Sequence, residues 1–95
     1  MPAYVIIEVT ILNPELIKQY QALAPATLAP FGGRYIARGG HNTTLEGGWE
    51  PQRMTLIEFP SVENAKAWWH SDAYSQARAT RKDAATMRMV ITEGL

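Results

Sequence analysis

The chain has 95 residues, 46% of them hydrophobic and 19% charged, and its nine basic side chains balance nine acidic ones. This length and composition indicate one globular domain, residues 1–95, and the neutral charge argues against nucleic-acid binding, which requires a basic surface. The chain has no cysteine, which excludes disulfides, thiolate nucleophiles and cysteine-ligated metals and fits a cytoplasmic location.

The first residues lead directly into a β-type run, without the basic leader and cleavage site of a signal peptide. Residues 4–12 (YVIIEVTIL) are rich in β-branched side chains and predict a strand that ends at Asn13-Pro14. No apolar run approaches the roughly 20 residues that span a bilayer. We therefore expect a soluble protein that does not bind membranes.

A helix is predicted next, because apolar residues recur at helical spacing from residue 16 onward. Asn13 can cap this helix, and Pro14 suits its first turn. Pro25 lacks the N–H that a continuing helix needs. The helix should therefore end or kink near Ala24, with a looser turn beyond it.

Two strands are predicted in the middle of the chain. The first covers residues 34–38, with a bend or bulge at Gly39-Gly40 and a continuation through residues 43–45. After a turn at Gly47-Gly48, residues 53–59 (RMTLIEF) form the next strand.

The last third of the chain predicts a helix and a final strand. Ser61 is placed to cap the helix, and a break near Ser71-Asp72 restarts it as a second helical piece carrying Tyr74, Arg81 and Ala85. Residues 87–92 form the last strand. The order βαββαβ predicts an α+β, ferredoxin-like fold in which a four-stranded antiparallel sheet carries its helices on one face.

The second face of this sheet is predicted to be partly apolar. In the first strand the continuous apolar set should face the helices: Val5, Ile7, Val9 and Ile11. The opposite face then combines apolar with charged residues: Tyr4, Ile6, Ile36, Met54 and Leu56 beside Glu8, Glu58, Arg34 and Arg38. A second copy of the chain is the simplest cover for such a patch, so we expect a homodimer. The alternative is a hydrated face with scattered apolar residues.

The charged residues of that face are the first candidates for a functional site. Arg34 and Arg38 share a face if no bulge intervenes, and could hold the carboxylate of a small organic anion. Alternatively they pair with Glu8 or Glu58, the ordinary solution to burial. Two carboxylates in one occluded site would raise the pKa of one and make it a general acid or base, whereas the arginines would lower it again.

His41 and Glu58 are the candidate catalytic residues. His41 follows the glycine bend and could shuttle protons near neutral pH, or could be a solvated loop histidine. With two histidines and no cysteine, no metal-ligand spacing exists, and the glycine pairs lack phosphate-binding spacing. We expect no metal and no cofactor.

The aromatic residues supply further substrate-binding candidates, namely Trp49, Trp69 and Tyr74, together with Arg81. Successive helical residues point about 100° apart, so Trp68 and Trp69 cannot both be fully buried, and one should line a groove or an interface. Tyr74 and Arg81 are two helical turns apart and could flank the same groove. Ordinary packing and a surface arginine are the alternative.

Several short motifs together resemble the family called domain of unknown function 1330. They are Gly-Gly-Arg-Tyr at 32–35, Arg-Gly-Gly at 38–40, Leu-Glu-Gly at 45–47 followed by Trp49, and Ile-Glu-Phe-Pro-Ser at 57–61. The resemblance implies a dimeric α/β barrel, in which two ferredoxin-like sheets pack face to face. That superfamily includes cofactor-independent monooxygenases, lactone isomerases, haem-handling enzymes and ligand-sensing domains.

Three functions remain open from the sequence. The first is a cofactor-independent enzyme acting on a small organic anion, monooxygenase- or isomerase-like by analogy of fold. The second is a module that binds or senses a metabolite without converting it. The third is a structural or stress-related dimer without a pocket. The chain lacks a clear nucleophile–base pair, which weighs against the first.

Overall fold

The computed structural model describes all 95 residues and has four strands and three α-helices. In chain order they are β1 (Ala3–Ile11), α1 (Ile17–Leu23), β2 (Arg34–Arg38), β3 (Arg53–Phe59), α2 (Val62–His70), α3 (Asp72–Ala79) and β4 (Ala85–Glu93). Two 3-10 turns, Pro25–Thr27 and Ala29–Phe31, connect α1 to β2. The predicted α+β fold is confirmed.

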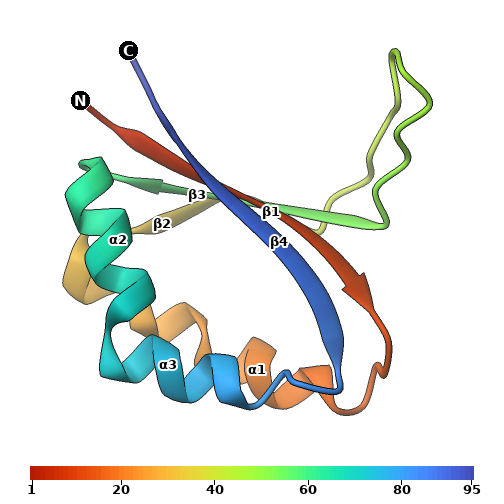
Figure 1. The fold of residues 1–95 in the computed structure, drawn as a ribbon, viewed down its shortest axis with the longest axis horizontal. Helices are drawn as coiled ribbons and strands as arrows, with labels where there is room; N and C mark the ends of the chain where they lie inside the picture. The colour runs from red at the N-terminus through yellow and green to blue at the C-terminus, as the bar shows by residue number, and fades with distance from the viewer.

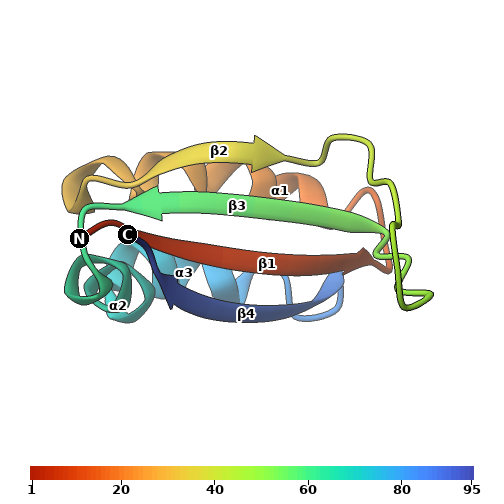
Figure 2. The same cartoon turned by 90° about the horizontal axis from the view of Figure 1, so that it is seen from above.

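The four strands form one antiparallel sheet in the order β2-β3-β1-β4. All three helices lie on one side of this sheet, so the molecule has two layers (Figure 1). Seen from above, α1 lies behind β2 and β3, whereas α2 and α3 lie behind the β1–β4 side (Figure 2). The other side of the sheet carries no helix, and we call it the open face.

Strict alternation of side chains along β1 fixes which residues enter the core. Val5, Ile7 and Val9 are buried, as predicted, while Ile6 and Glu8 between them are only partly covered. The same alternation in β3 buries its inward residues, Thr55, Ile57 and Phe59. The helices complete the core with Ile17 and Tyr20 of α1, Ala65 and Trp68 of α2, and Tyr74 and Ala77 of α3. The predicted assignment of faces is therefore confirmed for β1 and β3.

Polar side chains cap the helices where the sequence indicated. The Asn13 side-chain oxygen accepts hydrogen bonds from the backbone N–H groups of Glu15 and Leu16, although regular α-helix begins only at Ile17. Ser61 accepts from the N–H of Asn64, and Ser71 accepts from the N–H of Tyr74. The cap at Ser71 separates α2 from α3, so the predicted break is confirmed.

The end of α3 differs from the prediction. The helix stops at Ala79, and Arg81 lies in the following turn rather than on a helical stripe. Ala85, expected in the helix, is the first residue of β4 and pairs with Ile11. Ala84 is fully buried, and its carbonyl accepts from the N–H groups of Leu12 and Asn13. These backbone bonds to the end of β1 account for the early start of the strand.

The connection between β2 and β3 also corrects a prediction. Residues 43–45 form no strand, because the chain leaves the sheet after Arg38, where Gly39 adopts a positive φ of 69°. Residues 39–52 instead form a long projection, which we call the arm, and it rises from the sheet on the side away from the helices (Figure 1).

A β-bulge in β2 changes the direction of its last side chain. Arg34 pairs with Glu58 and Tyr35 with Ile57, but the register then shifts between Tyr35 and Ala37, and Arg38 pairs with Thr55. Because Thr55 faces the helices, Arg38 does so too, whereas Arg34 lies on the open face with Glu58. The expectation that the two arginines share a face is therefore wrong.

The two ends of the chain lie side by side (Figure 1). The backbone N–H of Gly94 donates to the carbonyl of Pro2 at 2.7 Å. None of the helices combines the length and apolar character needed to cross a bilayer.

Candidate functional site

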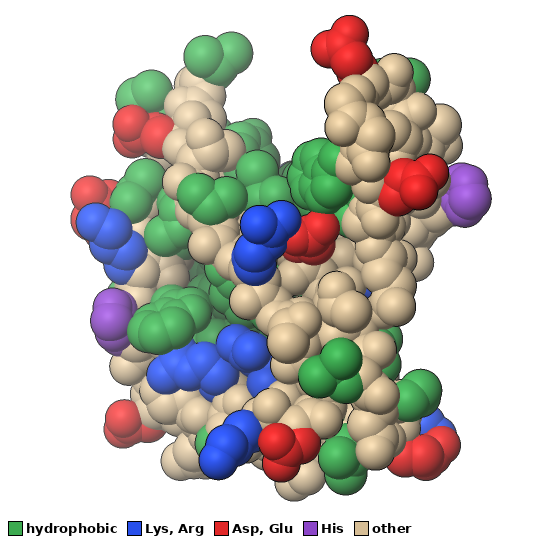
Figure 3. Space-filling model, turned by 45° about the vertical axis from the view of Figure 1, so that its right-hand side comes forward, with side chains coloured by type: hydrophobic (Ala, Val, Ile, Leu, Met, Phe, Trp, Pro, Cys, Tyr) green, Lys and Arg blue, Asp and Glu red, His purple; other side chains and the backbone are tan.

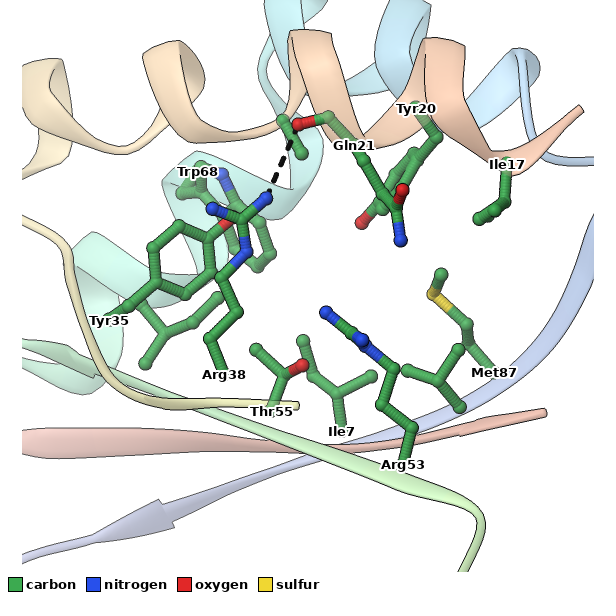
Figure 4. Close-up of a pocket in the computed structure, with 13 residues that line it drawn as sticks. Ile7, Ile17, Tyr20, Gln21, Tyr35, Arg38, Arg53, Thr55, Trp68 and Met87 are labelled. Carbon is green, nitrogen blue, oxygen red and sulfur yellow. Dashed lines mark hydrogen bonds between the residues drawn. The ribbon is translucent and has the colours of Figure 1, made fainter. Parts of the chain in front are cut away.

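A small cavity lies between the sheet and the helix layer, with a volume of about 40 Å³. That volume suffices for a few water molecules. Its walls are mostly apolar or aromatic, and the four remaining lining residues are polar or charged: Gln21, Arg38, Arg53 and Thr55. Figure 4 shows Arg38 and Arg53 rising from the sheet toward Gln21 and Tyr20 of α1.

Arg38 and Arg53 bring two positive charges to this cavity without a carboxylate partner. No acidic oxygen lies within 4.0 Å of either guanidinium, since the ion pairs of the chain involve other residues. Nη2 of Arg38 donates to the backbone carbonyl of Gln21 at 3.3 Å, and its guanidinium carbon lies 4.6 Å from the centre of the Tyr35 ring. Arg53 is partly buried and makes no side-chain hydrogen bond.

Local backbone features place both arginines. The bulge in β2 turns Arg38 inward, as described above. Gly39 leaves room for Arg53, because a Cβ atom at Gly39 would lie 2.5 Å from the guanidinium carbon of Arg53. Its positive φ of 69° disfavours a side chain as well. A bulge and one glycine therefore position the two charges.

Hydrogen-bonded aromatic side chains form the deep wall of the cavity. The hydroxyls of Tyr20 and Tyr74 lie 2.7 Å apart, and Nε1 of Trp68 donates to the Thr27 hydroxyl at 2.9 Å. Burial raises the pKa of Tyr20, and that of Tyr35 is also raised by burial despite the opposing charge of Arg38. Both phenols are therefore neutral at physiological pH and cannot serve as bases there.

The cavity lining contains no histidine, aspartate or glutamate. What it offers instead is two guanidinium groups beside an apolar and aromatic wall, which is an arrangement suited to an organic anion. Across the whole chain, no three histidine or acidic side chains come together as a metal site would require.

The predicted catalytic candidates lie elsewhere and are not brought together. Glu58 is on the open face, and its Oε1 lies 2.7 Å from Nη2 of Arg34. His41 is exposed on the arm, beyond the opposite end of β2.

Glu8 and Glu58 do not form a shared carboxylate site. Glu8 pairs with Met54 and Glu58 with Tyr4, so they lie four residues apart along the sheet, roughly 13 Å. Oε1 of Glu8 accepts from Arg88 at 2.8 Å and Oε2 from Nε1 of Trp49 at 2.8 Å. The hydrogen bond from Trp49, followed by that from Arg88, lowers the pKa of Glu8.

The aromatic candidates are dispersed. Trp68 is buried while Trp69 is 37% exposed, which confirms that only one tryptophan enters the core. The Arg78 guanidinium stacks on Trp69 at 3.7 Å from the ring centre. Tyr74 is fully buried against Tyr20 and lines no groove, and the Nε atom of Arg81 is buried without a hydrogen-bond partner.

Sequence reasoning missed Arg53, Gln21 and Tyr35 as parts of a site. A signal for Arg53 was present, because it shares the alternation of Thr55 and Ile57, which point under the helices. The inward turn of Arg38 had no such signal, since the position of the bulge depends on how β2 pairs with β3.

Comparison with known proteins gives a family and a fold. A family model described as "Domain of unknown function (DUF1330)" matches residues 2–95. No protein of curated function matches the sequence significantly.

Three solved structures are similar in fold. A protein of unknown function from Rhodopseudomonas palustris is 19% identical with a TM-score of 0.74, covering 99% of this chain and 82% of its own. A dimeric ferredoxin-like protein of unknown function from Thermobifida fusca is 14% identical with a TM-score of 0.68, covering 97% and 90%. SnoaB, a cofactor-independent oxygenase from Streptomyces nogalater, is 8% identical with a TM-score of 0.62, covering 99% and 93%.

Proposed function

The chain belongs to the domain of unknown function 1330 family, and we propose that it is a homodimer whose protomers each bind a small organic anion between the sheet and the helices. The observation that carries this proposal is the pair of guanidinium groups of Arg38 and Arg53, which meet at the inner cavity without a carboxylate.

The other two arginines of the sheet, unlike Arg38 and Arg53, each have a carboxylate partner. Arg34 is neutralised by Glu58, and Arg88 by Glu8, both on the open face. Two uncompensated cations beside an apolar wall repel each other, and an anionic group between them would relieve that repulsion through charge-assisted hydrogen bonds. A carboxylate matches the planar guanidinium fork better than a halide ion does.

The ligand must open the cavity as it enters. Small-molecule sites usually have volumes of roughly 300–1,000 Å³, so the cavity of about 40 Å³ has to widen before it can hold such a ligand. Arg38 is exposed, and its guanidinium makes only one long hydrogen bond, to the Gln21 carbonyl, besides its contact with the Tyr35 ring. Its side chain can swing outward at little cost, which widens the mouth between β2 and α1.

The open face supports the homodimer. Its apolar residues include Val90, 59% exposed, and Ile36, 43% exposed, beside the partly buried Ile6 and Leu56. Covering such a face is favourable by about 25 cal/mol for each Å² of apolar surface removed from water. Similar structures from Thermobifida fusca and Jannaschia are described as dimeric. Light scattering should give twice the chain mass of 10.6 kDa, and single chains at micromolar concentration would contradict the homodimer.

Cofactor-independent oxygenation is the second candidate function. It is favoured by the likeness in fold to SnoaB and by the arginine pair, which would stabilise the enolate or phenolate form of an acidic substrate. Because the cavity lining supplies no general base, this reaction would suit substrates that are already anionic. Oxygen consumption with such a substrate, measured with an electrode, tests it.

Binding is tested by calorimetry with a panel of mono- and dicarboxylic acids. Arg38→Gln and Arg53→Gln should each weaken binding about 10- to 100-fold, since a charge-assisted hydrogen bond contributes roughly 1.5–3 kcal/mol. Lys82→Gln, at an exposed position outside the cavity, removes the same charge and should leave the affinity unchanged. Equal losses in all three variants, or no acid bound by the unmodified chain, would refute the proposal.

A further inference from the structure

The arm exposes large apolar side chains to water and makes few contacts with its own protomer. No backbone–backbone hydrogen bond involves residues 40–52. Leu45 is 95% exposed and Trp49 is 54% exposed. Two side-chain bonds tie the arm to the sheet near its base, from Trp49 to Glu8 and from the N–H of Ile11 to the Gln52 side chain. A further bond, from Asn42 to the Pro51 carbonyl, lies within the arm. Its outer part, around Leu45, touches nothing that would hide it from water.

An apolar groove of about 380 Å³ lies at the other side of the molecule, between α2 and the free edge of β4. Its apolar lining includes Trp69, Met89 and Val90, and Lys66 and His70 lie at its margin. Val90 also belongs to the open face, where it pairs with Ile6. The groove is therefore continuous with the surface that the homodimer would cover.

We propose that the arm of each protomer crosses to its partner in the homodimer and seats Leu45 in the partner's α2–β4 groove. This inference rests on the homodimer of the proposed function and adds which segment fills which groove.

The positions of arm and groove along the strands suit a two-fold axis that runs across the strands. The arm leaves the sheet where Val9 pairs with Arg53, whereas the groove lies near Val5, which pairs with Ile91 toward the other end. Figure 1 shows the arm at one end of the strands, and α2 with both termini at the other. Packing two open faces about such an axis reverses the strand ends, and brings each arm to the partner's α2 end.

Shape and charge agree with this arrangement. The space-filling view shows the open face as a hollow between two projections, one of them the arm (Figure 3). The arm contains Glu46 and Glu50 and no lysine or arginine. The groove offers Lys66 and His70. The acidic arm and the basic groove margin are complementary, which favours the arm of a second copy over a basic partner protein as the occupant.

The absence of cysteine makes cross-linking a direct test. Leu45→Cys and Val90→Cys chains are prepared separately, mixed, allowed to exchange subunits and oxidised. A disulfide forms only where the Cα atoms come within about 7 Å. We expect a cross-linked dimer on a non-reducing gel, with the residue 45–residue 90 linkage identified by mass spectrometry.

The controls separate this inference from the homodimer itself. Ala22→Cys, exposed on α1 in the helix layer, should not cross-link to Leu45→Cys. Cross-linking of Leu45→Cys only to itself would mean that arm meets arm, and would overturn the inference while keeping the dimer. Dimers seen by light scattering without any 45–90 linkage would do the same. Single chains would overturn both.

A second measurement avoids engineered cysteines. Leu45→Ala should raise the dimer dissociation constant at least roughly tenfold, because a buried leucine side chain is lost from the interface. Leu23→Ala, at a 43% exposed position on α1, is the matched control and should leave the constant unchanged. Circular dichroism verifies that both variants fold. An unchanged constant for Leu45→Ala would count against the inference.

Discussion

The hydroxyls of Tyr20 and Tyr74, 54 residues apart in the chain, lie 2.7 Å from each other in the core and join α1 to α3. Their rings meet edge to face, with centres 6.2 Å apart. Because both side chains are buried, each hydroxyl is the hydrogen-bond partner of the other.

Removing one of these hydroxyls should destabilise the fold at least as much as removing both. Tyr20→Phe or Tyr74→Phe leaves the remaining buried hydroxyl unpaired, at a cost of about 1–3 kcal/mol. The double variant removes both polar groups, so its free energy of unfolding should equal or exceed that of either single variant. Urea denaturation of the four proteins completes the cycle. Additive losses would mean that the hydroxyls act independently.

Gly39 should be sensitive to substitution where its neighbour Gly40 is not. Gly39→Ala forces a Cβ atom into a positive-φ position and against the Arg53 guanidinium. We expect a loss of about 1–2 kcal/mol in stability, from the backbone conformation alone, and weaker binding of organic anions. A Cβ atom at Gly40 meets nothing within 4 Å, so Gly40→Ala is the control. Equal effects at both positions would refute this role for Gly39.

The pKa of Glu8 should rise when Trp49 is replaced. The indole hydrogen bond is the largest influence that lowers this pKa, ahead of Arg88. Trp49→Phe should therefore move the pKa of Glu8 back toward the ordinary value of a glutamate, as followed by NMR titration of the carboxyl carbon. Trp69→Phe is the control.

The lowered pKa of Glu8 also has a consequence for acid stability. The pKa of Glu8 is lower in the folded than in the unfolded chain. Ionised Glu8 therefore stabilises the fold when the pH is above the unfolded pKa. This contribution is lost as the pH falls through the folded pKa. Trp49→Phe should lose less stability than the unmodified chain between pH 5 and the acid transition. Parallel stability curves for the two proteins would contradict the pairing.

Tyr35 should ionise later than a free tyrosine, and later still without Arg38. Burial raises its pKa, while the charge of Arg38 opposes that effect. Arg38→Gln should raise the pKa of Tyr35 further, so that its phenolate absorbance appears at a higher pH. This absorbance step should be missing in the Arg38→Gln/Tyr35→Phe double variant. Because the folded pKa exceeds the unfolded one, the stability due to neutral Tyr35 is complete below about pH 10 and falls as the pH rises further. An earlier ionisation in Arg38→Gln would contradict this placement.

The alternation of apolar and polar residues along the sequence predicted most of the fold. In β1 the four inward apolar residues and the intervening Glu8 fixed both the strand and its buried face, because the period of a strand is two residues. Ser61 and Ser71 marked helix starts through a local hydrogen bond that the sequence itself specifies. Such features depend on neighbours along the chain.

The candidate site depended on contacts between distant segments, and sequence reasoning largely failed there. Arg38 turns inward only because β2 pairs with β3 one residue out of register beyond Tyr35. The helix α3 ends earlier than predicted because the carbonyl of Ala84 accepts hydrogen bonds from the N–H groups of Leu12 and Asn13. Arg53 could have been found, since it continues the inward alternation of Thr55 and Ile57.

The hydrogen bond from Gly94 to Pro2 makes circular permutation practical. A short linker could join the two ends, and new ends could be opened at Gly47-Gly48, in a stretch without backbone bonds to the sheet. Every strand pairing would survive this reconnection, while the projection between β2 and β3 would be severed. Such a permuted chain would show which parts of the polypeptide are needed for folding alone and which are needed only for association with a second copy.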